Sequence, residues 1–330
     1  MVSKQLTWGI LGTATIAKQS MIPGILESST GSIGAIASRS LDKAQAFASE
    51  FSIPTAYGSY EELVADPSID AVYIPLPNHL HKEWVIRSAK AKKHVLCEKP
   101  ISLNQSELEE MKRVCEENNV LLLDAFMYRY QERYTHIKNH IKNGDIGDLR
   151  GIRSSFSFNN AGALDNFRMK KEFGGGSLYD IGVYPLSLAR MIFEEEPEAI
   201  TVHSYSPDSH NGVDMSAAGL VEFNNGRFLT FDCGMWAAYR NDAEILGSTG
   251  RILIPDPFTG GLEGFQLIQG SEQRQIDVED TNHYAKQADY FAHVVWGETA
   301  NRFGIEDSLA NMRLLDGALA SQEKRERVVL

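Results

Sequence analysis

The chain has 330 residues, of which 43% are hydrophobic and 23% charged, which predicts two domains around a sizeable core. Its formal net charge of −12 argues against nucleic acid or an anionic membrane surface as the main partner. No apolar run approaches the ~20 residues that span a bilayer, and the N-terminus shows no signal-peptide pattern. The three widely spaced cysteines predict reduced thiols in a cytoplasmic protein, not a disulfide framework or a zinc site.

Short apolar runs alternate with helical spacings over the first 125 residues. Strands are expected at 6–11, 34–37 and 71–74, in a run that ends at Lys99, and at 120–124; helices are expected at 12–28, 41–51, 60–65, 80–91 and 105–118. Ser59 is expected to cap the third of these helices, with Glu61 and Glu62 in its first turn. Because strands and helices alternate regularly, residues 1–125 are predicted to form a doubly wound parallel sheet of the dinucleotide-binding (Rossmann) type.

The pattern changes in residues 126–330. Helices are expected at 131–143, 177–193, 282–297 and 306–322, and strands at 149–158, 199–206, 216–223, 227–235, 243–247 and 251–254. Consecutive strands without intervening helices predict an α+β domain with a large, open, mainly antiparallel sheet. An exposed sheet face needs a partner, so this domain is expected to bind substrate and to form a homodimer or homotetramer.

A strand, a turn and a helix follow one another at Gly9-Ile-Leu-Gly-Thr-Ala-Thr-Ile-Ala17. A dinucleotide fold needs small residues at this turn, for the bend, for close approach of the pyrophosphate and for helix packing. Gly12, Ala14 and Ala17 supply them as G-x-A-x-x-A. The pyrophosphate is therefore expected on the helix N-terminus, with Thr13 and Ile16 also at the cofactor.

The end of the second strand distinguishes the two nicotinamide cofactors. Enzymes that use NAD usually place an acid there to bind the ribose 2′-OH, whereas this chain has Ser38-Arg39-Ser40 and no acid before Asp42. An arginine and hydroxyl groups suit a 2′-phosphate, so NADP is predicted, with NAD possible. The alternative is that Arg39 is merely solvated and Ser40 caps the next helix.

The stretch His94-Val-Leu-Cys-Glu-Lys-Pro-Ile101 ends a buried strand in an acid, a base and a proline. Ligands of α/β folds bind at the carboxyl ends of such strands. Lys99, beside Glu98 and stiffened by Pro100, can hold its ammonium at a fixed point there. The alternative is a surface Lys–Glu pair of little consequence.

Three motifs together resemble the Gfo/Idh/MocA oxidoreductases, and the resemblance covers nearly the whole chain. They are Gly9-Ile-Leu-Gly-Thr-Ala-Thr-Ile-Ala17, Glu98-Lys99-Pro100 and Gly174-Gly-Gly-Ser-Leu-Tyr-Asp-Ile-Gly-Val-Tyr184. Within that family the chain is most similar to the branch that contains dimeric dihydrodiol dehydrogenase, NADP-dependent xylose dehydrogenase and glucose–fructose oxidoreductase.

The resemblance implies roles for individual residues. Lys99 matches the family lysine between nicotinamide and substrate, Tyr184 the general acid/base of the dihydrodiol branch, and Asp180 the family aspartate one turn earlier. The inositol branch has histidine in place of Tyr184, so inositol is not the implied substrate. The peptide before Pro100 is commonly cis in the family. The residues implied near the cofactor are Leu76, Pro77, Asn78, His81, Glu98 and Arg168.

A phenol and an ammonium form a sensible catalytic pair. Hydride transfer to a carbonyl leaves an alkoxide that must be protonated, and a phenol with a pKa near ~10 is a weak acid at neutral pH. A nearby ammonium stabilises the phenolate and polarises the carbonyl oxygen. The expected reaction is reversible hydride transfer between NADP(H) and a carbinol or carbonyl of a sugar, polyol or trans-dihydrodiol.

Several alternatives stay open at this point. Ser177 and Asp180 could form a variant capping box, Pro185 could turn Asp180 and Tyr184 away from a common helix face, and Tyr184 could be a core aromatic. Two histidines, His79 and His81, are weak grounds for a metal, and no metal is predicted. Arg129, Arg168 and Tyr128 could contact substrate or cofactor, or be structural. The competing functions are a non-catalytic dinucleotide-sensing regulator and an enzyme acting on a tetrapyrrole or other aromatic carbonyl.

Overall fold

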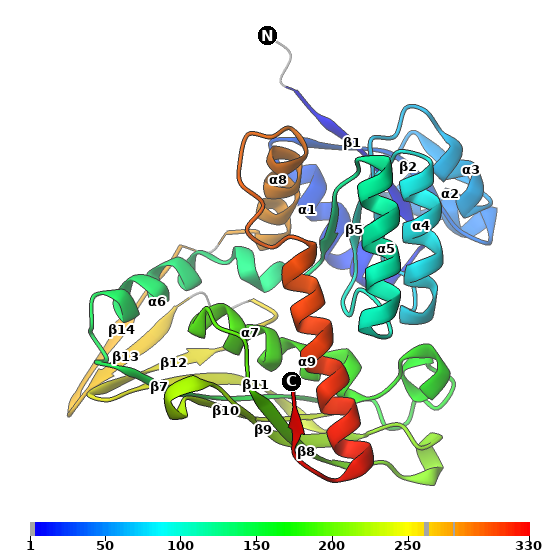
Figure 1. Ribbon diagram of the computed structural model, residues 1–330. Helices are drawn as coiled ribbons and strands as arrows, with labels where there is room; N and C mark the ends of the chain where they lie inside the picture. The colour runs from blue at the N-terminus through cyan, green and yellow to red at the C-terminus, as the bar shows by residue number, and fades with distance from the viewer. Residues whose placement is uncertain (1–3, 261–263, 280) are drawn as a thin grey trace. The chain divides into compact units, whose positions relative to one another are not determined.

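The structure is a computed structural model that describes residues 4–260, 264–279 and 281–330. The chain forms two compact units. The first unit comprises the chain up to Tyr130 together with Asn282–Leu309, and the second unit comprises Gln131–Thr281 with Ala310–Leu330. One boundary between the units therefore falls inside the long helix α9 (Ile305–Lys324), labelled in Figure 1.

The first unit contains a six-stranded sheet in which every pairing is parallel, in the order β3-β2-β1-β4-β5-β6. Its strands are β1 (Leu6–Leu11), β2 (Gly31–Ala37), β3 (Thr55–Tyr57), β4 (Ala71–Ile74), β5 (His94–Cys97) and β6 (Leu122–Asp124). The order reverses between β1 and β4, which is the position where doubly wound sheets bind ligands. The predicted Rossmann architecture of this part of the chain is confirmed.

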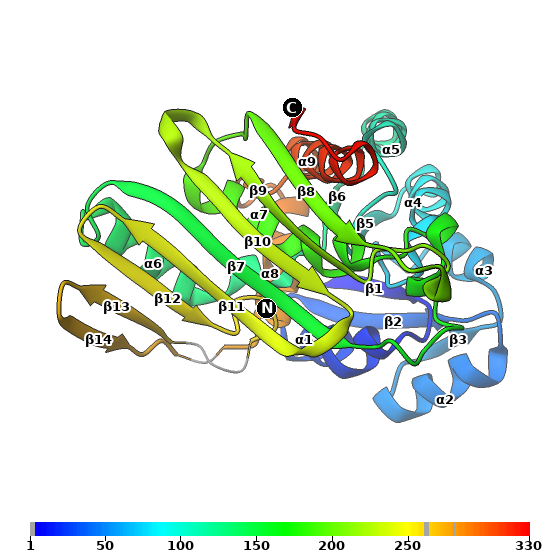
Figure 2. The same ribbon diagram turned by 90° about the horizontal axis from the view of Figure 1, so that it is seen from below.

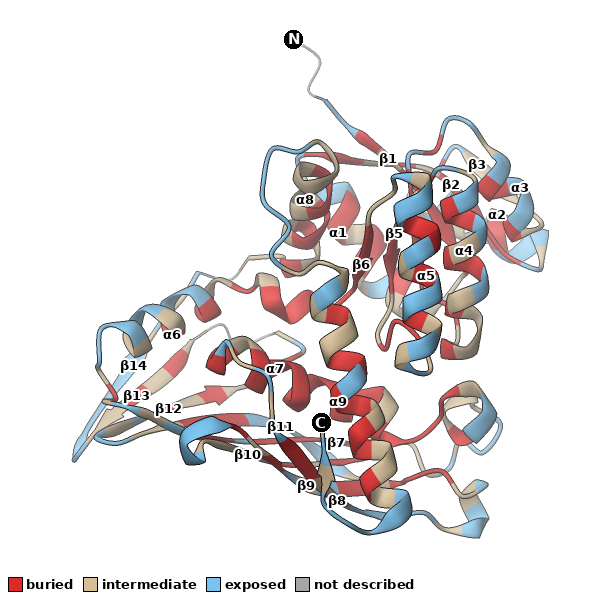
Figure 3. Cartoon of the chain, in the orientation of Figure 1, coloured by how far each residue is buried: buried red, intermediate tan, exposed pale blue. Residues whose placement is uncertain are grey.

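Helices cover both faces of this sheet. Trp8 packs on Phe291 of α8, with ring centroids 4.8 Å apart, whereas its neighbour Gly9 faces Leu63 of α3. Successive strand residues point to opposite faces, so α8 and α3 lie on opposite sides. Figure 3 shows buried residues on the inner sides of α4 and α5 and exposed ones outside. The helices are α1 (Ile22–Glu27), α2 (Leu41–Phe51), α3 (Tyr60–Ala65), α4 (His81–Lys90), α5 (Gln105–Asn118), α8 (His283–Val295), and the short η1 (Ala17–Met21), η2 (Asn78–Leu80) and η3 (Met127–Tyr130).

A local sequence signal explains where α3 begins. Ser59 and Glu62 form a reciprocal capping box at the start of α3, which confirms the predicted cap. The helix after β1 differs from a regular α-helix, because residues Ala17–Met21 form a π-helical turn. Such widened turns are frequent at functional sites.

The second unit is built on a nine-stranded sheet in the order β14-β13-β12-β11-β7-β10-β9-β8-β15. Only the pairing of β7 with β10 is parallel among the described strands, so the sheet is mixed and mostly antiparallel, as expected. Its strands are β7 (Leu149–Asn159), β8 (Ala199–Tyr205), β9 (Ser216–Glu222), β10 (Phe228–Gly234), β11 (Trp236–Gly247), β12 (Gly250–Pro255), β13 (Phe265–Gln269), β14 (Glu272–Ile276) and β15 (Val328–Val329).

Helices of the second unit pack on one face of this sheet. There the alternate apolar residues of the strands, such as Ile152, Phe156 and Leu229, are buried. Figure 2 shows the other face of the sheet without a covering helix from the described part of this unit. Besides the C-terminal part of α9, the helices are α6 (Glu132–Lys142), α7 (Val183–Phe193), the π-helical η6 (Leu178–Gly182), and the short η4 (Phe167–Met169), η5 (Lys171–Phe173), η7 (Asp208–His210) and η8 (Asn224–Gly226). No helix in the described residues of the chain has the length and apolarity needed to cross a membrane.

Candidate active site

A pocket of about 460 Å³ lies in the first unit where the strand order reverses. It is lined by the turn after β1, the end of β2 and its following helix, α3, and the loop after β4. The lining residues are Gly12, Thr13, Ala14, Ser38, Arg39, Ser40, Lys43, Tyr60, Pro75, Leu76 and Pro77. Seven of the predicted cofactor residues, Gly12, Thr13, Ala14, Ser38, Arg39, Leu76 and Pro77, thus lie around one cavity. Ile16 begins the helical turn that follows.

Gly12 makes the sharp turn at the floor of this pocket. Its φ is +126°, a backbone conformation that side chains rarely adopt, and a Cβ atom there would lie 3.1 Å from Leu76 Cδ2. Its N–H donates to the carbonyl of Ala37, the last residue of β2, at 2.9 Å. The turn therefore brings the backbone to the pocket beside the start of the following helix, an arrangement that suits an anionic group.

The side of the pocket at the end of β2 is cationic. Arg39 and Lys43 both line it together with the hydroxyls of Ser38 and Ser40, and none of the described lining residues carries a carboxylate. The phenol of Tyr60 closes this side; burial raises the pKa of Tyr60, and the adjacent Arg39 guanidinium opposes that rise. Lys43 and Tyr60 were not predicted from the sequence, although Lys43 lies only four residues after Arg39, in the first turn of α2.

Glu98 and Lys99 follow β5, the strand next to β4. The phenol of Tyr73 donates to Glu98 Oε1 at 2.5 Å, and burial, the largest cause, raises the pKa of Tyr73 so that it stays a donor. The peptide between Lys99 and Pro100 is cis. Both Glu98 and Lys99 are half-buried, so Lys99 is a side chain held at the strand end and not one extended into solvent.

His81 is fully buried at the start of α4, close to the pocket but not on its lining. Its Nε2 lies 2.7 Å from the carbonyl oxygen of Leu76, and its Nδ1 lies 2.9 Å from that of Pro100. The imidazole thus lies between the loop after β4 and the loop after β5, and in its neutral form it donates its one N–H to one of the two carbonyls. Burial lowers the pKa of His81 to about 4, so the ring is neutral at pH 7. Asn78, three residues earlier, is also buried.

A buried carboxyl group lies at the end of β6. Asp124 is paired in register with Cys97, and burial raises its pKa to about 8, while Arg129 and Lys99 lower it and Asp307 and Glu98 raise it further. Arg129 itself forms an ion pair with Asp307 at 2.7 Å and stacks on Phe126. This arrangement gives Arg129 a structural partner within the first unit.

In the second unit, Arg168 and Asp180 form an ion pair with Nε and Oδ2 2.8 Å apart. Asp180 lies in the π-helical turn η6, and Tyr184 lies in the first turn of α7, which follows η6 directly. The ring of Tyr184 lies among aromatic neighbours, 5.2 Å from Phe258 and 5.6 Å from Phe156 between centroids. Ser177 makes no capping hydrogen bond to its helix, so the alternative of a capping box with Asp180 is wrong.

These two regions divide the predicted site residues. All the residues expected around the cofactor except Arg168 come from the first unit, whereas Arg168, Asp180 and Tyr184 come from the second. The first set can hold a nucleotide through a glycine turn, backbone amides and cations. The second set offers a carboxylate, a guanidinium and a phenol, which are groups that bind hydroxyls and move protons.

Comparison with known proteins places these features in a family. Residues 6–126 match the model of an oxidoreductase family with an NAD-binding Rossmann fold, and residues 134–253 match that of the GFO/IDH/MocA C-terminal domain. The chain therefore belongs to the Gfo/Idh/MocA family of NAD(P)-dependent oxidoreductases, whose characterised relatives here act on CH–OH groups.

Particular relatives are similar over most of their length. D-xylose 1-dehydrogenase (NADP(+)) 2 of Haloferax volcanii is 34% identical, covering 98% of this chain and all of that protein. Trans-1,2-dihydrobenzene-1,2-diol dehydrogenase of Xenopus tropicalis is 31% identical, covering 83% and 82% of the two chains. The structure of a 3-ketoreductase from Actinomadura kijaniata in complex with NADP and TDP-benzene is similar with a TM-score of 0.90 and 29% identity, over 96% of this chain and 98% of that one.

Proposed function

We propose that this protein transfers a hydride reversibly between NADP(H) and a carbinol or carbonyl carbon of a sugar, polyol or trans-dihydrodiol. The observation that carries the proposal is the pocket after β1, β2 and β4, in which a glycine turn and two cations, Arg39 and Lys43, lie without a carboxylate. A 2′-phosphate would be bound there by charge-assisted hydrogen bonds, whereas the unphosphorylated ribose would lack its usual acidic partner. NAD remains a weaker second cofactor in this proposal.

Tyr184 is proposed as the general acid/base and Lys99 as the cation that stabilises its phenolate and polarises the substrate oxygen. When bound, the nicotinamide cofactor supplies or accepts the hydride. Asp180, paired with Arg168, is proposed to accept a hydrogen bond from a substrate hydroxyl. The similar 3-ketoreductase has also been solved with one lysine replaced by alanine and with one tyrosine replaced by phenylalanine. These are the two residue types to which we give catalytic roles.

Roles near the nicotinamide are proposed for the loops after β4 and β5. Asn78 and Glu98 would contact the cofactor, and Arg168 would lie close to it. The ring nitrogens of His81 lie next to the backbone carbonyls of Leu76 and Pro100. His81 would stabilise these two loops and would not contact the substrate.

Cofactor titration and a substrate panel test the proposal. The dissociation constants of NADP(H) and NAD(H) are measured by nicotinamide fluorescence, and turnover with sugars, polyols and trans-dihydrodiols is followed at 340 nm. We expect NADP(H) to bind more tightly by at least tenfold, and Arg39→Ala to reduce that preference. Arg113→Ala is the matched control, because Arg113 is an exposed arginine of the same unit that pairs with Glu117. A preference for NAD(H) would contradict the cofactor proposal, and cofactor binding without turnover on any substrate would favour a dinucleotide-sensing regulator.

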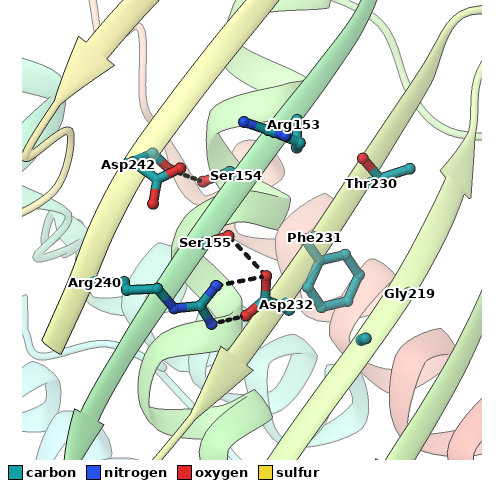
Figure 4. A pocket seen from close by; sticks show the side chains of 10 residues that line it. Arg153, Ser154, Ser155, Gly219, Thr230, Phe231, Asp232, Arg240 and Asp242 are labelled. Atoms are coloured by element: carbon teal, nitrogen blue, oxygen red, sulfur yellow. Dashed lines mark hydrogen bonds and ion pairs between the residues drawn. The ribbon is translucent and has the colours of Figure 1, made fainter. Parts of the chain in front are cut away.

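The uncovered face of the nine-stranded sheet is proposed as the interface of a homodimer, or of a homotetramer built from such dimers. A hollow of about 570 Å³ lies on it, lined by β7, β9, β10 and β11. Figure 4 shows interleaved charges there: Arg240 pairs with Asp232, which also accepts a 2.7 Å hydrogen bond from Ser155 Oγ. On the same sheet Glu244 lies between Arg251, at 2.6 Å, and Arg153, at 3.7 Å.

A surface that carries both signs of charge in alternation can be complementary to its own copy, as a two-fold interface requires. Exposed apolar groups accompany it: Leu220 is the cross-strand partner of Thr230 in the hollow, and Tyr205 stacks on Trp236 with centroids 4.7 Å apart. We expect sedimentation to show a dimer or tetramer, and Arg240→Glu to shift it toward monomer while Arg113→Glu leaves it unchanged. A wild-type monomer at micromolar concentration would contradict the interface.

We propose that the protein works in the cytoplasm. The three thiols, Cys97, Cys115 and Cys233, are all free and buried, which suits a reducing compartment.

A further inference from the structure

The helical segment that carries Asp180 and Tyr184 consists of η6 and α7, residues 178–193. A carboxylate from elsewhere in the second unit fixes the start of this segment. Asp214, which precedes β9, uses Oδ2 to accept hydrogen bonds from Ser177 Oγ at 2.6 Å and from the N–H of Leu178 at 2.8 Å. The carbonyl of Asp214 also accepts from the N–H of Ser177 at 2.7 Å. All three contacts are made at Ser177 and Leu178, two to seven residues before the proposed catalytic groups.

The chain passes so close to Asp214 that one position there must be glycine. Gly176 has a φ of +114°, and a Cβ atom on it would lie 2.1 Å from Asp214 Oδ1. The N–H of Gly176 donates to the carbonyl of Arg168 at 3.0 Å, and the side chain of Arg168 pairs with Asp180. The glycine turn therefore connects Asp214, Arg168 and the start of the helical segment.

The contacts of Asp214 with Ser177 and Leu178 are shielded from water. Asp214 is 4% exposed, and Ser177 and Leu178 are fully buried, so water cannot replace the lost hydrogen bonds when one partner is removed. Burial raises the pKa of Asp214 to about 6, while the bonds from Ser177 and Leu178 lower it, so the carboxylate is mostly ionised at pH 7 and above. The Cys233 thiol of β10 faces the same site, and burial raises its pKa, so it stays neutral there. A negative charge at the N-terminal end of a helix is favourable.

We infer that Asp214 is a positioning residue for catalysis: its carboxylate fixes the helix start, so that Asp180 and Tyr184 are held in the orientation the reaction needs. The inference rests on the proposed function, because it assumes that these two residues act on the substrate. Asp214 itself acts through Ser177 and Leu178 and not on the substrate.

The test compares Asp214→Ala with Asp214→Asn. Alanine removes both side-chain hydrogen bonds, and we expect kcat to fall by about 10²-fold, the loss that a misplacement near 1 Å can cause. Asparagine keeps an oxygen that can accept the same two bonds, so it should recover most of the lost activity. The dissociation constant of NADP(H) should change much less than kcat in both variants, because every residue that lines the cofactor pocket lies in the first unit. Asp208→Ala, in the exposed turn before the same strand, is the matched control.

Kinetics are measured at a temperature where each variant is fully folded, alongside amide hydrogen exchange of residues 178–184. Faster exchange there together with the loss of kcat in Asp214→Ala is the expected result. An active wild type and an Asp214→Ala variant with unchanged kcat would overturn the inference and leave the proposed function standing. A wild type without turnover on any substrate would overturn the proposed function first, and with it the positioning role.

Discussion

Arg168 and Asp180 form an ion pair in which Nε and Oδ2 are 2.8 Å apart, and the carboxylate is the more buried partner, with a side chain 11% exposed against 31% for the arginine. The two residues lie in different helical turns, η4 and η6. A carboxylate held in this way has one oxygen directed to the guanidinium, and its orientation is set before any substrate arrives. The pair therefore links a residue expected at the cofactor to one expected at the substrate.

Replacing Arg168 should disturb the substrate more than the cofactor. Arg168→Gln removes the guanidinium from the largely buried Asp180, and we expect kcat/KM for the best sugar or diol to fall at least about tenfold, which corresponds to ~1.4 kcal/mol. Arg168→Lys keeps the charge and should lose less. Steady-state kinetics with saturating NADP(H) measure the effect, and a glutamine variant with wild-type kcat/KM would show that the pair is only structural.

His81 is predicted to stabilise the loop after β4 and the loop after β5, which carries Lys99. His81→Ala leaves the carbonyls of Leu76 and Pro100 buried without that ring, so unfolding in urea should require ~1–3 kcal/mol less free energy. The affinity for NADP(H) should weaken as well, because Leu76 lines the pocket. Lys82→Ala is the control, because Lys82 is the next residue of α4, is only half-buried and pairs with Glu110 instead of these loops. Equal unfolding midpoints and cofactor affinities in the His81 and Lys82 variants would refute this role.

Asp124 should make the protein less stable as pH rises. Its pKa is raised by burial from 3.8 to about 8 in the folded protein, so the folded state binds a proton that the unfolded state releases above about pH 4. The resulting stability is fully present below pH 3.8 and is lost as pH rises toward 8, with a slope of at most ~1.4 kcal/mol per pH unit.

The Asp124→Asn variant isolates this effect. His81, whose folded pKa is lowered to about 4, has the opposite sign and destabilises the protein as pH falls from 6.5. His81 is present in both proteins, so its effect cancels in the comparison. The unfolding free energy of Asp124→Asn minus that of the wild type should therefore increase from pH 5 to pH 8, because only the wild type loses stability over this range. Parallel stability curves across that range would contradict the raised pKa.

The elements of the first unit follow from local sequence signals, and this is why they could be predicted. Ser59 with Glu62 defines the start of α3, and the buried run Ala71–Ile74 with its following prolines defines β4. The strands β13 and β14 were missed; β14 (Glu272–Ile276) is an exposed edge strand with polar residues, so it lacks an apolar alternation. The short β3 and β15, of three and two residues, are set by pairing to their neighbours and not by their own pattern.

The candidate site shows the same division between local and distant information. Gly12 could be predicted at the cofactor from the small-residue turn after β1, and Arg39 from the lack of an acid after β2; both line the pocket. Tyr60 was not predicted, because it enters from α3, and the contacts of Asp214 with Ser177 join residues 37 positions apart. Helical spacing also could not show that residues 283–295 pack on β1, since that depends on the contact of Phe291 with Trp8.

Lys99 and Tyr184 are proposed to act together in hydride transfer. A double-mutant cycle on kcat/KM, with Lys99→Ala, Tyr184→Phe and the double variant, tests this joint role. Each single change should slow turnover by about 10²–10⁴-fold while NADP(H) still binds, and the double variant should be about as slow as the slower single one, as for residues that act together. Single variants that keep wild-type turnover, or losses that simply multiply in the double variant, would contradict the joint role.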